Sequence, residues 1–336
     1  MKVLFIGGTG VISCACSRLV VERGVDLVLL NRGESSRPVP KSVQILNVDI
    51  RDKDATRRAL SREDYDVVVD WVAFTPEHIE TDLELFRGRT GHYIFISSAS
   101  VYETPPSKLP ITESTPLSNP FWQYSRDKIA CEDRLMRSYR EEQFPVTIVR
   151  PSHTYDQSNF PLKGRYTPID RMRKGKKIIV HGDGTSLWTL THNSDFAKGF
   201  VPLLGDQRAV GEAFHITTDA LLSWNQIYEF AAKAAGATAS IVHIPSDVIA
   251  KYDAEWGGDL LGDKAHSMIF DNSKIKQFVP EFSAAVPFSQ GIEEIMSWHD
   301  ADAARRIVDV QLDRLMDKMI SDWEAYTKGL PKRQPV

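Results

Sequence analysis

The sequence predicts an α/β protein built on a doubly wound parallel sheet. Over the first 150 residues, short apolar runs that suit buried strands alternate with polar or amphipathic stretches that suit helices. The length of 336 residues allows about two domains. A composition of 42% hydrophobic and 26% charged residues is that of an ordinary globular chain with material for a core.

The predicted elements follow in order from their local pattern. Residues 3–6 (VLFI) are wholly apolar and end in glycines, as a buried parallel strand does, and Gly24 closes a helix over residues 17–23. The further strands are expected at residues 26–30 (DLVLL), 66–69 (DVVV), 93–96 (YIFI) and 146–149 (VTIV). The further helices are expected at residues 54–60 and 124–142.

After Arg150 the sequence becomes richer in proline and less regular. We expect short strands at residues 178–181 and 213–216, helices near 225–235 and 289–299, and charged helix over the last forty or so residues. This pattern predicts a dinucleotide-binding domain over 1–155, with segments near 190–220 that return to it. A smaller C-terminal α/β lobe for the substrate, with the C-terminal helices, is expected over 156–336.

Charge and cysteine content exclude several classes of protein. A balance of 41 Lys+Arg against 45 Asp+Glu gives no support to binding of a nucleic-acid backbone, which needs concentrated positive charge. Three cysteines do not suit a disulfide framework or a zinc site. The apolar N-terminal run is interrupted by glycines, and no later run reaches the roughly 18 residues of a membrane span. We expect a cytoplasmic protein with no metal, membrane or nucleic-acid partner.

A glycine-rich loop, GGTGVIS at residues 7–13, joins the first strand to the first helix. Glycines let a backbone approach a pyrophosphate, and the N–H groups at a helix start then face it. This context predicts a Rossmann-type dinucleotide site. Its predicted contacts are Gly7, Thr9, Gly10, Val11 and Ile12.

The end of the second strand and the segment at Asp49-Ile50 offer the next contacts. Asn31-Arg32 stands where an NAD-binding protein usually has an acidic residue for the ribose hydroxyls, and an arginine there can meet a 2′-phosphate instead. Asn31 can still bond a hydroxyl, so the cofactor is NAD or NADP. Asp49 and Ile50 are expected at the adenine.

A catalytic pair is suggested by Tyr124 and Lys128, which share one face of the predicted helix. An ammonium beside a phenol favours the phenolate, which suits acid/base work on a carbinol or ketone. Ser98 lies in a run of hydroxyls that follows the strand at 93–96, where it can bond the same substrate oxygen.

Taken together, these motifs resemble the extended short-chain dehydrogenase/reductase family, the NAD-dependent epimerases and dehydratases of nucleotide sugars. The resemblance covers about residues 1–300 and also rests on Arg150-Pro151 with Tyr155 and on Gly182-Asp183-Gly184. It implies that Tyr124 is the acid/base, that Lys128 bonds the nicotinamide ribose, that Ser98 orients the reacting group, and that Ala73 lies near the cofactor. It also implies a possible homodimer.

The resemblance narrows the reaction. Family 4,6-dehydratases carry an Asp-Glu pair directly after the catalytic hydroxyl, where this chain has Ala99 and Ser100, so dehydration is disfavoured and the pattern is similar to that of 4-epimerases. Trp188 replaces an arginine that usually binds the substrate diphosphate. Either Arg165, Arg171 or Arg173 takes over, or the substrate lacks a diphosphate. Ser100, His153 and Trp188 are candidate substrate contacts.

Three hypotheses remain from the sequence. The first is an NAD(P)-dependent epimerase or oxidoreductase that acts on a sugar carbinol or ketone, with a nucleotide sugar as the small-molecule substrate. The second is a reductase or dehydrogenase of a non-nucleotide carbonyl compound. The third is a non-catalytic NAD(P)- or RNA-binding relative.

Overall fold

The computed structural model describes residues 1–60 and 63–329. The chain forms two compact units. Unit 1 consists of Met1–Asp156, Thr189–Leu221 and Ile269–Pro287, and unit 2 consists of Gln157–Trp188, Leu222–Met268 and the chain from Phe288 onward. Unit 1 therefore includes two later segments of the chain, and the second of them, 269–287, was not considered from the sequence.

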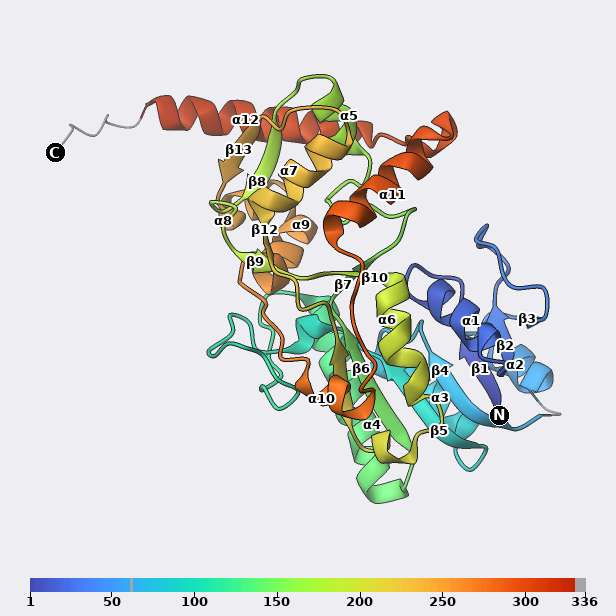
Figure 1. Cartoon of the computed structure of the whole chain (residues 1–336). Helices are drawn as coiled ribbons and strands as arrows, with labels where there is room; N and C mark the ends of the chain where they lie inside the picture. Colours follow the sequence, from blue (N-terminus) through green and yellow to red (C-terminus); the bar gives the residue numbers. More distant parts are fainter. Residues whose placement is uncertain (61–62, 330–336) are drawn as a thin grey trace. The chain divides into compact units, whose positions relative to one another are not determined.

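Unit 1 is built on a seven-stranded sheet whose paired strands are all parallel (Figure 1). Its order is β11-β6-β5-β4-β1-β2-β3. The strands are β1 (Lys2–Ile6), β2 (Asp26–Asn31), β3 (Gln44–Asn47), β4 (Tyr65–Asp70), β5 (Thr90–Ile96), β6 (Val146–Pro151) and β11 (Ala213–Ile216). The strand order reverses between β1 and β4, which is where an open parallel sheet binds its ligand.

Helices cover both faces of this sheet, because successive residues of each buried strand point to opposite sides. Val3 and Phe5 of β1 join the core beneath α1, α6 and α10, whereas Leu4 and Ile6 join the core beneath α2, α3 and α4. The doubly wound α/β class predicted from the sequence is confirmed. The helices of unit 1 are α1 (Ser13–Glu22), α2 (Lys53–Leu60), α3 (Pro76–Phe86), α4 (Gln123–Glu142), α6 (Asn193–Phe200) and α10 (Ser273–Phe278).

Shorter elements complete unit 1. The strands β7 (His153–Tyr155) and β10 (Leu190–His192) form a separate parallel pair. Single 3₁₀ turns are η1 (Ala99–Val101), η2 (Val201–Leu203) and η3 (Gln207–Ala209).

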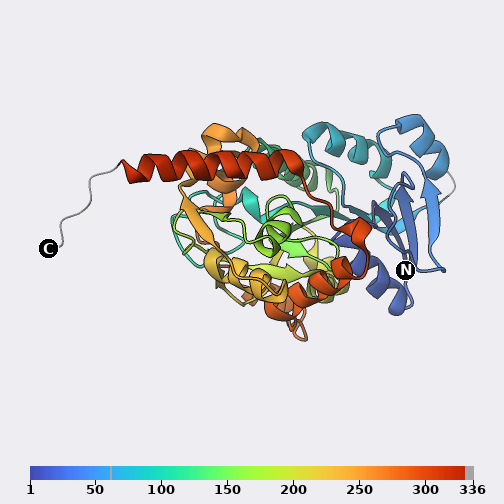
Figure 2. The same ribbon diagram turned by 90° about the horizontal axis from the view of Figure 1, so that it is seen from above.

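Unit 2 contains two small sheets and six α-helices within the described residues. One sheet pairs β8 (Ile178–His181) with β13 (Ile241–Ile244), and the other pairs β9 (Leu187–Trp188) with β12 (Leu222–Ser223). The helices are α5 (Thr167–Arg173), α7 (Trp224–Ala234), α8 (Ser246–Tyr252), α9 (Ala254–Asp259), α11 (Phe288–Asp300) and α12 (Val310–Lys328); η4 (Leu260–Lys264) is a π-helical turn and η5 (Ala303–Arg305) a 3₁₀ turn. The long helix α12 is the red one in both views (Figures 1 and 2).

The structure shifts the start of one predicted helix and contains several elements that were not predicted, among them α3. Helix α1 begins at Ser13 rather than Ser17, because its first turn consists of small residues without a clear apolar period, and these are buried against the sheet and α6. Helix α3 was not predicted, although Ile79, Leu83 and Phe86 follow a helical spacing behind Pro76 at the helix start. The predicted C-terminal helix is α12, and residues 330–336 lie outside the described part of the chain.

In the described chain, none of the helices combines the length and the apolar character that a bilayer crossing requires.

A buried histidine in β5 makes the stability of unit 1 depend on pH. Thr147 Oγ1 donates to the Ala209 carbonyl (2.5 Å), so His92 Nε2 donates to Thr147 Oγ1 (2.7 Å), and His92 Nδ1 accepts the N–H of Gly205 (3.2 Å). This arrangement requires the neutral ring, and burial lowers the pKa of His92 from 6.5 to about 4.

We predict that acid destabilises the protein through His92. The unfolded chain takes up this proton below about pH 6.5 whereas the folded chain resists it to about pH 4, so stability falls as the pH falls between these values. The loss at pH 5 should be on the order of 2 kcal/mol. His92→Asn, whose amide does not titrate, should lose less stability between pH 7 and pH 5 in denaturant unfolding. His243→Gln, at an exposed histidine, should follow wild type. Equal losses in all three proteins would contradict this assignment.

Candidate functional site

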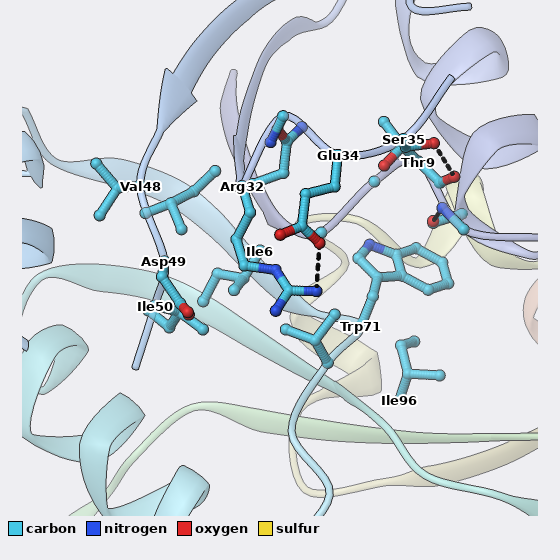
Figure 3. Close-up of a pocket in the computed structure, with 18 of the residues that line it drawn as sticks. Ile6, Thr9, Arg32, Glu34, Ser35, Val48, Asp49, Ile50, Trp71 and Ile96 are labelled. Atoms are coloured by element: carbon cyan, nitrogen blue, oxygen red, sulfur yellow. Dashed lines mark hydrogen bonds and ion pairs between the residues drawn. The ribbon is translucent and has the colours of Figure 1, made fainter. Parts of the chain in front are cut away.

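A pocket of about 770 Å³ lies in unit 1, around the loops that follow β1, β2, β3 and β4 (Figure 3). A volume of this size suits a ligand of cofactor dimensions. Its lining includes all the predicted cofactor contacts of the first three loops: Gly7, Thr9, Gly10, Val11, Ile12, Asn31, Arg32, Asp49 and Ile50. The cofactor site proposed from the sequence and the pocket therefore coincide in unit 1.

The first loop has a backbone that only glycine adopts without strain. Gly7 and Gly8 have φ angles of +104° and +93°, and a Cβ on Gly8 would lie 2.5 Å from Leu29 Cδ2. Ser13 Oγ accepts the N–H of Gly10 (2.8 Å) and Ser17 Oγ donates to the Gly8 carbonyl (2.8 Å), so the loop is fixed to the start of α1. Ser13 stands at the position of the motif's third glycine, which usually allows close packing of helix and strand. Here the Ser13 side chain instead accepts a hydrogen bond from the loop. The loop fits a diphosphate facing a helix N-terminus.

The end of β2 presents polar and charged groups to the pocket. Asn31 Oδ1 accepts the N–H of Gly33 (2.9 Å), which holds the turn in place. Arg32 is exposed and pairs with Glu34 across 2.9 Å (Figure 3). Glu34 and Arg37 also line the pocket and were not predicted from the sequence, because they lie in an irregular loop with no motif.

At the end of β3, Asp49 Oδ1 accepts the backbone N–H of Arg51 (3.0 Å). Arg51 in turn donates to the Val72 carbonyl (2.5 Å), which links this loop to the one after β4. Arg51 lines the pocket and was also missed, because an exposed arginine beside an acidic residue resembles an ordinary surface position.

Another part of the pocket wall is formed by the loop after β4, which lies beside the glycine loop, and by the end of β5. Trp71, Val72, Phe74, His78 and Ile96 line it. The N–H of Phe74 donates to His78 Nδ1 (3.0 Å), and burial, with Arg51 nearby, lowers the pKa of His78. His78 was not considered from the sequence, because α3 had not been predicted.

Helix α4 brings Tyr124 and Lys128 beside this wall. Lys128 Nζ lies 5.9 Å from the centre of the Tyr124 ring and 4.8 Å from that of Phe74, and the Tyr124 and Phe74 rings are 6.5 Å apart. Tyr124 is half-buried, whereas Lys128 is 2% exposed. The two side chains adjoin the pocket through Phe74 and Ile96 rather than lining it.

Lys128 is a buried cation held by backbone carbonyls. Its Nζ donates to the carbonyl of Ala73 (2.6 Å), in the loop after β4, and to that of Ile96 (2.8 Å), the last residue of β5. Burial lowers the pKa of Lys128 from 10.5 to about 8, while Cys131, Asp70 and Glu132 act in the opposite direction. Ala73, expected near the cofactor, is buried and contributes this carbonyl.

An internal ion pair fixes the helix that carries both groups. Glu132, one turn beyond Lys128, pairs with Arg150 of β6 through two hydrogen bonds, Nε–Oε1 at 3.0 Å and Nη2–Oε2 at 2.6 Å. The Arg150 guanidinium also lies 4.9 Å from the centre of the Tyr102 ring. Both members of the pair are buried, so α4 is tied to the sheet behind the pair Tyr124 and Lys128.

Three serine hydroxyls form a chain after β5. Ser125 Oγ donates to Ser100 Oγ (2.8 Å), which leaves the Ser100 hydrogen to be donated to Ser98 Oγ (2.9 Å). Ser98 Oγ also accepts the Ser100 N–H (3.2 Å). With its acceptor positions used, half-buried Ser98 keeps its own O–H to donate outward.

The remaining sequence candidates lie elsewhere. His153 is half-buried on β7 of unit 1. Trp188 belongs to unit 2 and is 1% exposed, with its ring 5.5 Å from that of Trp224, so it is a core residue there and its stacking role is not carried further. Arg171 is buried and pairs with Asp313 and Asp317, and Arg173 pairs with Asp300, so both of these candidate cations have carboxylate partners within unit 2.

The fold and pocket define a dinucleotide-binding α/β protein. Over residues 1–60 and 63–329, His, Cys, Asp and Glu side chains form no group of three that could hold a metal ion. Residues 3–217 match the NAD dependent epimerase/dehydratase family, and the chain belongs to that family. A nicotinamide dinucleotide, NAD or NADP, is the cofactor, and the glycine loop of the pocket fits one.

Two curated relatives illustrate the range of similarity. A 2′-dehydrokanamycin reductase of Streptomyces kanamyceticus is 24% identical over 293 residues, which cover 84% of this chain and 80% of that protein. The chloroplast stem-loop binding protein of 41 kDa b from Arabidopsis thaliana is 29% identical over 255 residues, which cover 70% of this chain and 63% of that protein.

Solved structures share the fold. A UDP-glucose 4-epimerase from Bifidobacterium longum, in complex with NAD⁺ and UDP, superposes with a TM-score of 0.72 at 20% identity, over 90% of this chain and 99% of that one. A dTDP-glucose 4,6-dehydratase from Bacillus anthracis, in complex with NAD, superposes with a TM-score of 0.73 at 19% identity, over 90% and 98%. Epimerases and dehydratases therefore both carry this fold, and similarity does not separate them.

We predict that Gly8→Ala weakens dinucleotide binding at least about tenfold, because a side chain at φ +93° distorts the phosphate loop. Calorimetric titration with NAD(H) and NADP(H) measures the effect. Gly24→Ala is the matched control, because Gly24 also has a positive φ (+73°) but a Cβ there meets open space beyond α1. Gly24→Ala should lower the melting temperature yet leave the Kd unchanged. Equal Kd values for both variants would contradict the role of the loop.

Proposed function

We propose that this chain is an NAD(P)-dependent epimerase or oxidoreductase that acts on a carbinol or ketone of a sugar, with Tyr124 as its acid/base. The observation that carries the proposal is the placement of Tyr124 and Lys128 on one face of α4, with Lys128 Nζ bonded to the carbonyls of Ala73 and Ile96. These carbonyls adjoin Phe74 and Ile96 of the pocket wall.

Tyr124 holds or releases the proton of the reacting oxygen. In one direction the phenolate takes the proton of a carbinol, and in the other the phenol returns it to a carbonyl oxygen. The bound nicotinamide supplies the hydride acceptor or donor for this reaction. The ammonium of Lys128 near the Tyr124 ring favours the phenolate, which makes the proton transfer feasible near neutral pH.

Lys128 and Ser98 complete the arrangement. Two of the three Nζ hydrogens of Lys128 are bonded to Ala73 and Ile96, which leaves the third for a ribose hydroxyl. The outward O–H of Ser98 donates to the substrate oxygen, where it polarises a carbonyl and orients a carbinol. Ser100 and Ser125 act through Ser98 by fixing the direction of its hydrogen.

Two substrate classes fit this chemistry. Nucleotide sugars are supported by structural neighbours such as the 4-epimerase from Bifidobacterium longum. A sugar ketone without a diphosphate is supported by the relative named 2′-dehydrokanamycin reductase and by the internal ion pairs of Arg171 and Arg173. Net reduction consumes one NAD(P)H per product whereas epimerisation consumes none, so cofactor absorbance during turnover of each class separates them.

Dehydration is not part of the proposal. Elimination of water needs its own acid and base, and the positions after Ser98 are the methyl group of Ala99 and the hydroxyl of Ser100. The name of the chloroplast relative suggests RNA binding, but the chain has a net charge of −4. Retention of RNA in a gel, with no sugar substrate turned over, would favour that function instead.

Within this proposal NADP(H) is the preferred cofactor. Asn31 occupies the place of the acid that an NAD site uses, and its Oδ1 is engaged by Gly33. Arg32 and Arg37 both line the pocket, and a 2′-phosphate can replace the Glu34 carboxylate as the partner of Arg32. The exposed ion pair of Arg32 and Glu34 stabilises the protein little, so replacing Glu34 by a 2′-phosphate as the partner of Arg32 costs little free energy.

We predict that Arg32→Ala raises the Kd for NADPH about tenfold and leaves the Kd for NADH within about twofold, since only NADPH carries the 2′-phosphate. Glu34→Gln, which releases Arg32, should tighten NADPH binding and serves as the opposite control. Fluorescence titration measures both. Tighter binding of NADH than of NADPH by wild type would overturn the preference.

We predict that Tyr124→Phe lowers kcat at least about a hundredfold with little change in cofactor affinity, because the proton donor is lost while the ring remains. Tyr139→Phe on the same helix is the matched control and should turn over substrate like wild type. Stopped-flow absorbance of the nicotinamide reports the step. A Tyr124→Phe protein with the kcat of wild type on a confirmed substrate would contradict the proposed role of Tyr124.

A further inference from the structure

Two carboxyl groups lie together beneath the turn that bonds Lys128. Asp70 ends β4 and Asp82 lies in the middle of α3, and both are fully buried. Asp70 Oδ1 accepts the N–H groups of Val72 (2.5 Å) and Ala73 (2.8 Å), while Asp82 Oδ2 accepts the hydroxyl of Tyr93 (2.6 Å). One oxygen of each carboxyl is therefore satisfied.

The second carboxyl oxygen of each aspartate, Asp70 Oδ2 and Asp82 Oδ1, is buried and has no hydrogen-bond partner among the described residues. Asp70 is also one of the groups that raise the pKa of Asp82, through its charge and through hydrogen bonding. Two buried carboxylates that interact in this way cannot both be ionised without a large electrostatic cost. One proton between the two oxygens satisfies both.

The proton belongs to Asp82. Asp70 accepts two backbone N–H groups, whereas Asp82 accepts a single hydroxyl group. Burial, and then the neighbouring Asp70, raise the pKa of Asp82 well above its usual range. Asp82 thus donates to Asp70 and accepts from Tyr93, and a single negative charge remains on Asp70.

This charge acts on the Lys128 ammonium, whose hydrogen-bond partners among the described residues are the carbonyls of Ala73 and Ile96. Lys128 bonds Ala73, whose own N–H is held by Asp70, and Asp70 is one of the groups that raise the pKa of Lys128. We propose that Asp70 and Asp82 share one proton, and that the single charge left on this pair keeps the Lys128 ammonium protonated at the pocket. Asp70 is thus a positioning residue, and the inference rests on the proposed role of Lys128.

Other charged and titratable groups face this cluster from the elements packed against it. They are Arg51 after β3, His78 on α3, Tyr93 on β5, and Cys131 and Glu132 on α4. The cation Arg51 lowers the pKa of Asp82 only as the last of its contributions.

Infrared spectroscopy tests the shared proton without any activity. Protein labelled with ¹³C at the aspartate carboxyl should show a protonated-acid C=O band at neutral pH that is absent in Asp82→Asn. Asp263 of unit 2, whose pKa burial raises to about 7, contributes equally to both spectra and cancels in the difference. An unchanged band would show that Asp82 is ionised and would overturn the proposal.

Asparagine substitutions test the charge. Asp82→Asn replaces the neutral donor with an amide and keeps the charge on Asp70, so we expect wild-type behaviour. The double variant Asp70→Asn/Asp82→Asn removes the charge, while the amide oxygen introduced at position 70 still accepts the two N–H groups. For carbonyl reduction, kcat/KM of wild type should fall as the pH rises through about 8, where Lys128 loses its charge. In the double variant this fall should move to lower pH by at least about half a unit.

Each outcome separates the alternatives. If the pH at which kcat/KM falls moves as far in Asp82→Asn as in the double variant, both carboxyl groups of the wild type are charged. If that pH does not move in the double variant, Lys128 does not respond to a charge on this pair. Either result overturns the proposal. If the double variant binds the dinucleotide within about twofold of the wild-type affinity, the turn at Val72 and Ala73 is intact. A Tyr124→Phe protein with full activity would instead refute the proposed function and leave the infrared result standing. If the double variant does not fold, the infrared comparison decides.

Discussion

The bonds from the Lys128 ammonium to the carbonyls of Ala73 and Ile96 are the interaction on which the site depends. An isolated buried charge is costly, and only well-placed partners offset that cost. The partners here come from the loop after β4 and the end of β5, and these two strands are neighbours in the parallel sheet. Parallel pairing brings both carboxyl ends to one edge, so the sheet itself builds the receptor for the cation.

The position of Tyr124 follows from the same arrangement. Lys128 fixes the first turns of α4 to the sheet, and Glu132 fixes the next turn to Arg150 of β6. Further along, Arg134 of α4 pairs with Glu80 of α3 on the surface. Two buried attachments leave the helix little freedom to rotate, and the half-buried phenol is held beside Phe74 at the pocket wall. The geometry that the proposed acid/base chemistry needs is therefore a property of core packing rather than of a loop.

The sequence was informative where a function needs a fixed local pattern. The glycine loop, the pair at Tyr124 and Lys128, and the hydroxyls after β5 are short motifs tied to one strand or helix, and the parallel fold followed from strand and helix alternation. Residues that reach the pocket from irregular loops, such as Glu34, Arg37 and Arg51, carry no such pattern. Trp188 shows the converse error, because a motif position suggested a ligand contact while packing against Trp224 makes it core. Asp70 and Asp82 are twelve residues apart, and only the packing of α3 on the sheet brings them together.

The electrostatics of the two ends of the site are matched to different tasks. At the phosphate loop, neutral backbone N–H groups and exposed arginines meet an anion that arrives with the cofactor, so no buried counter-charge is required. At the proposed catalytic end, the cation belongs to the protein and is buried, and the proposed mechanism needs it to stay charged at working pH. A full carboxylate in direct contact would raise the pKa of Lys128 and hold it in an ion pair. A charge one hydrogen-bonded turn away, at Asp70, offsets part of the desolvation cost and leaves Nζ its third hydrogen.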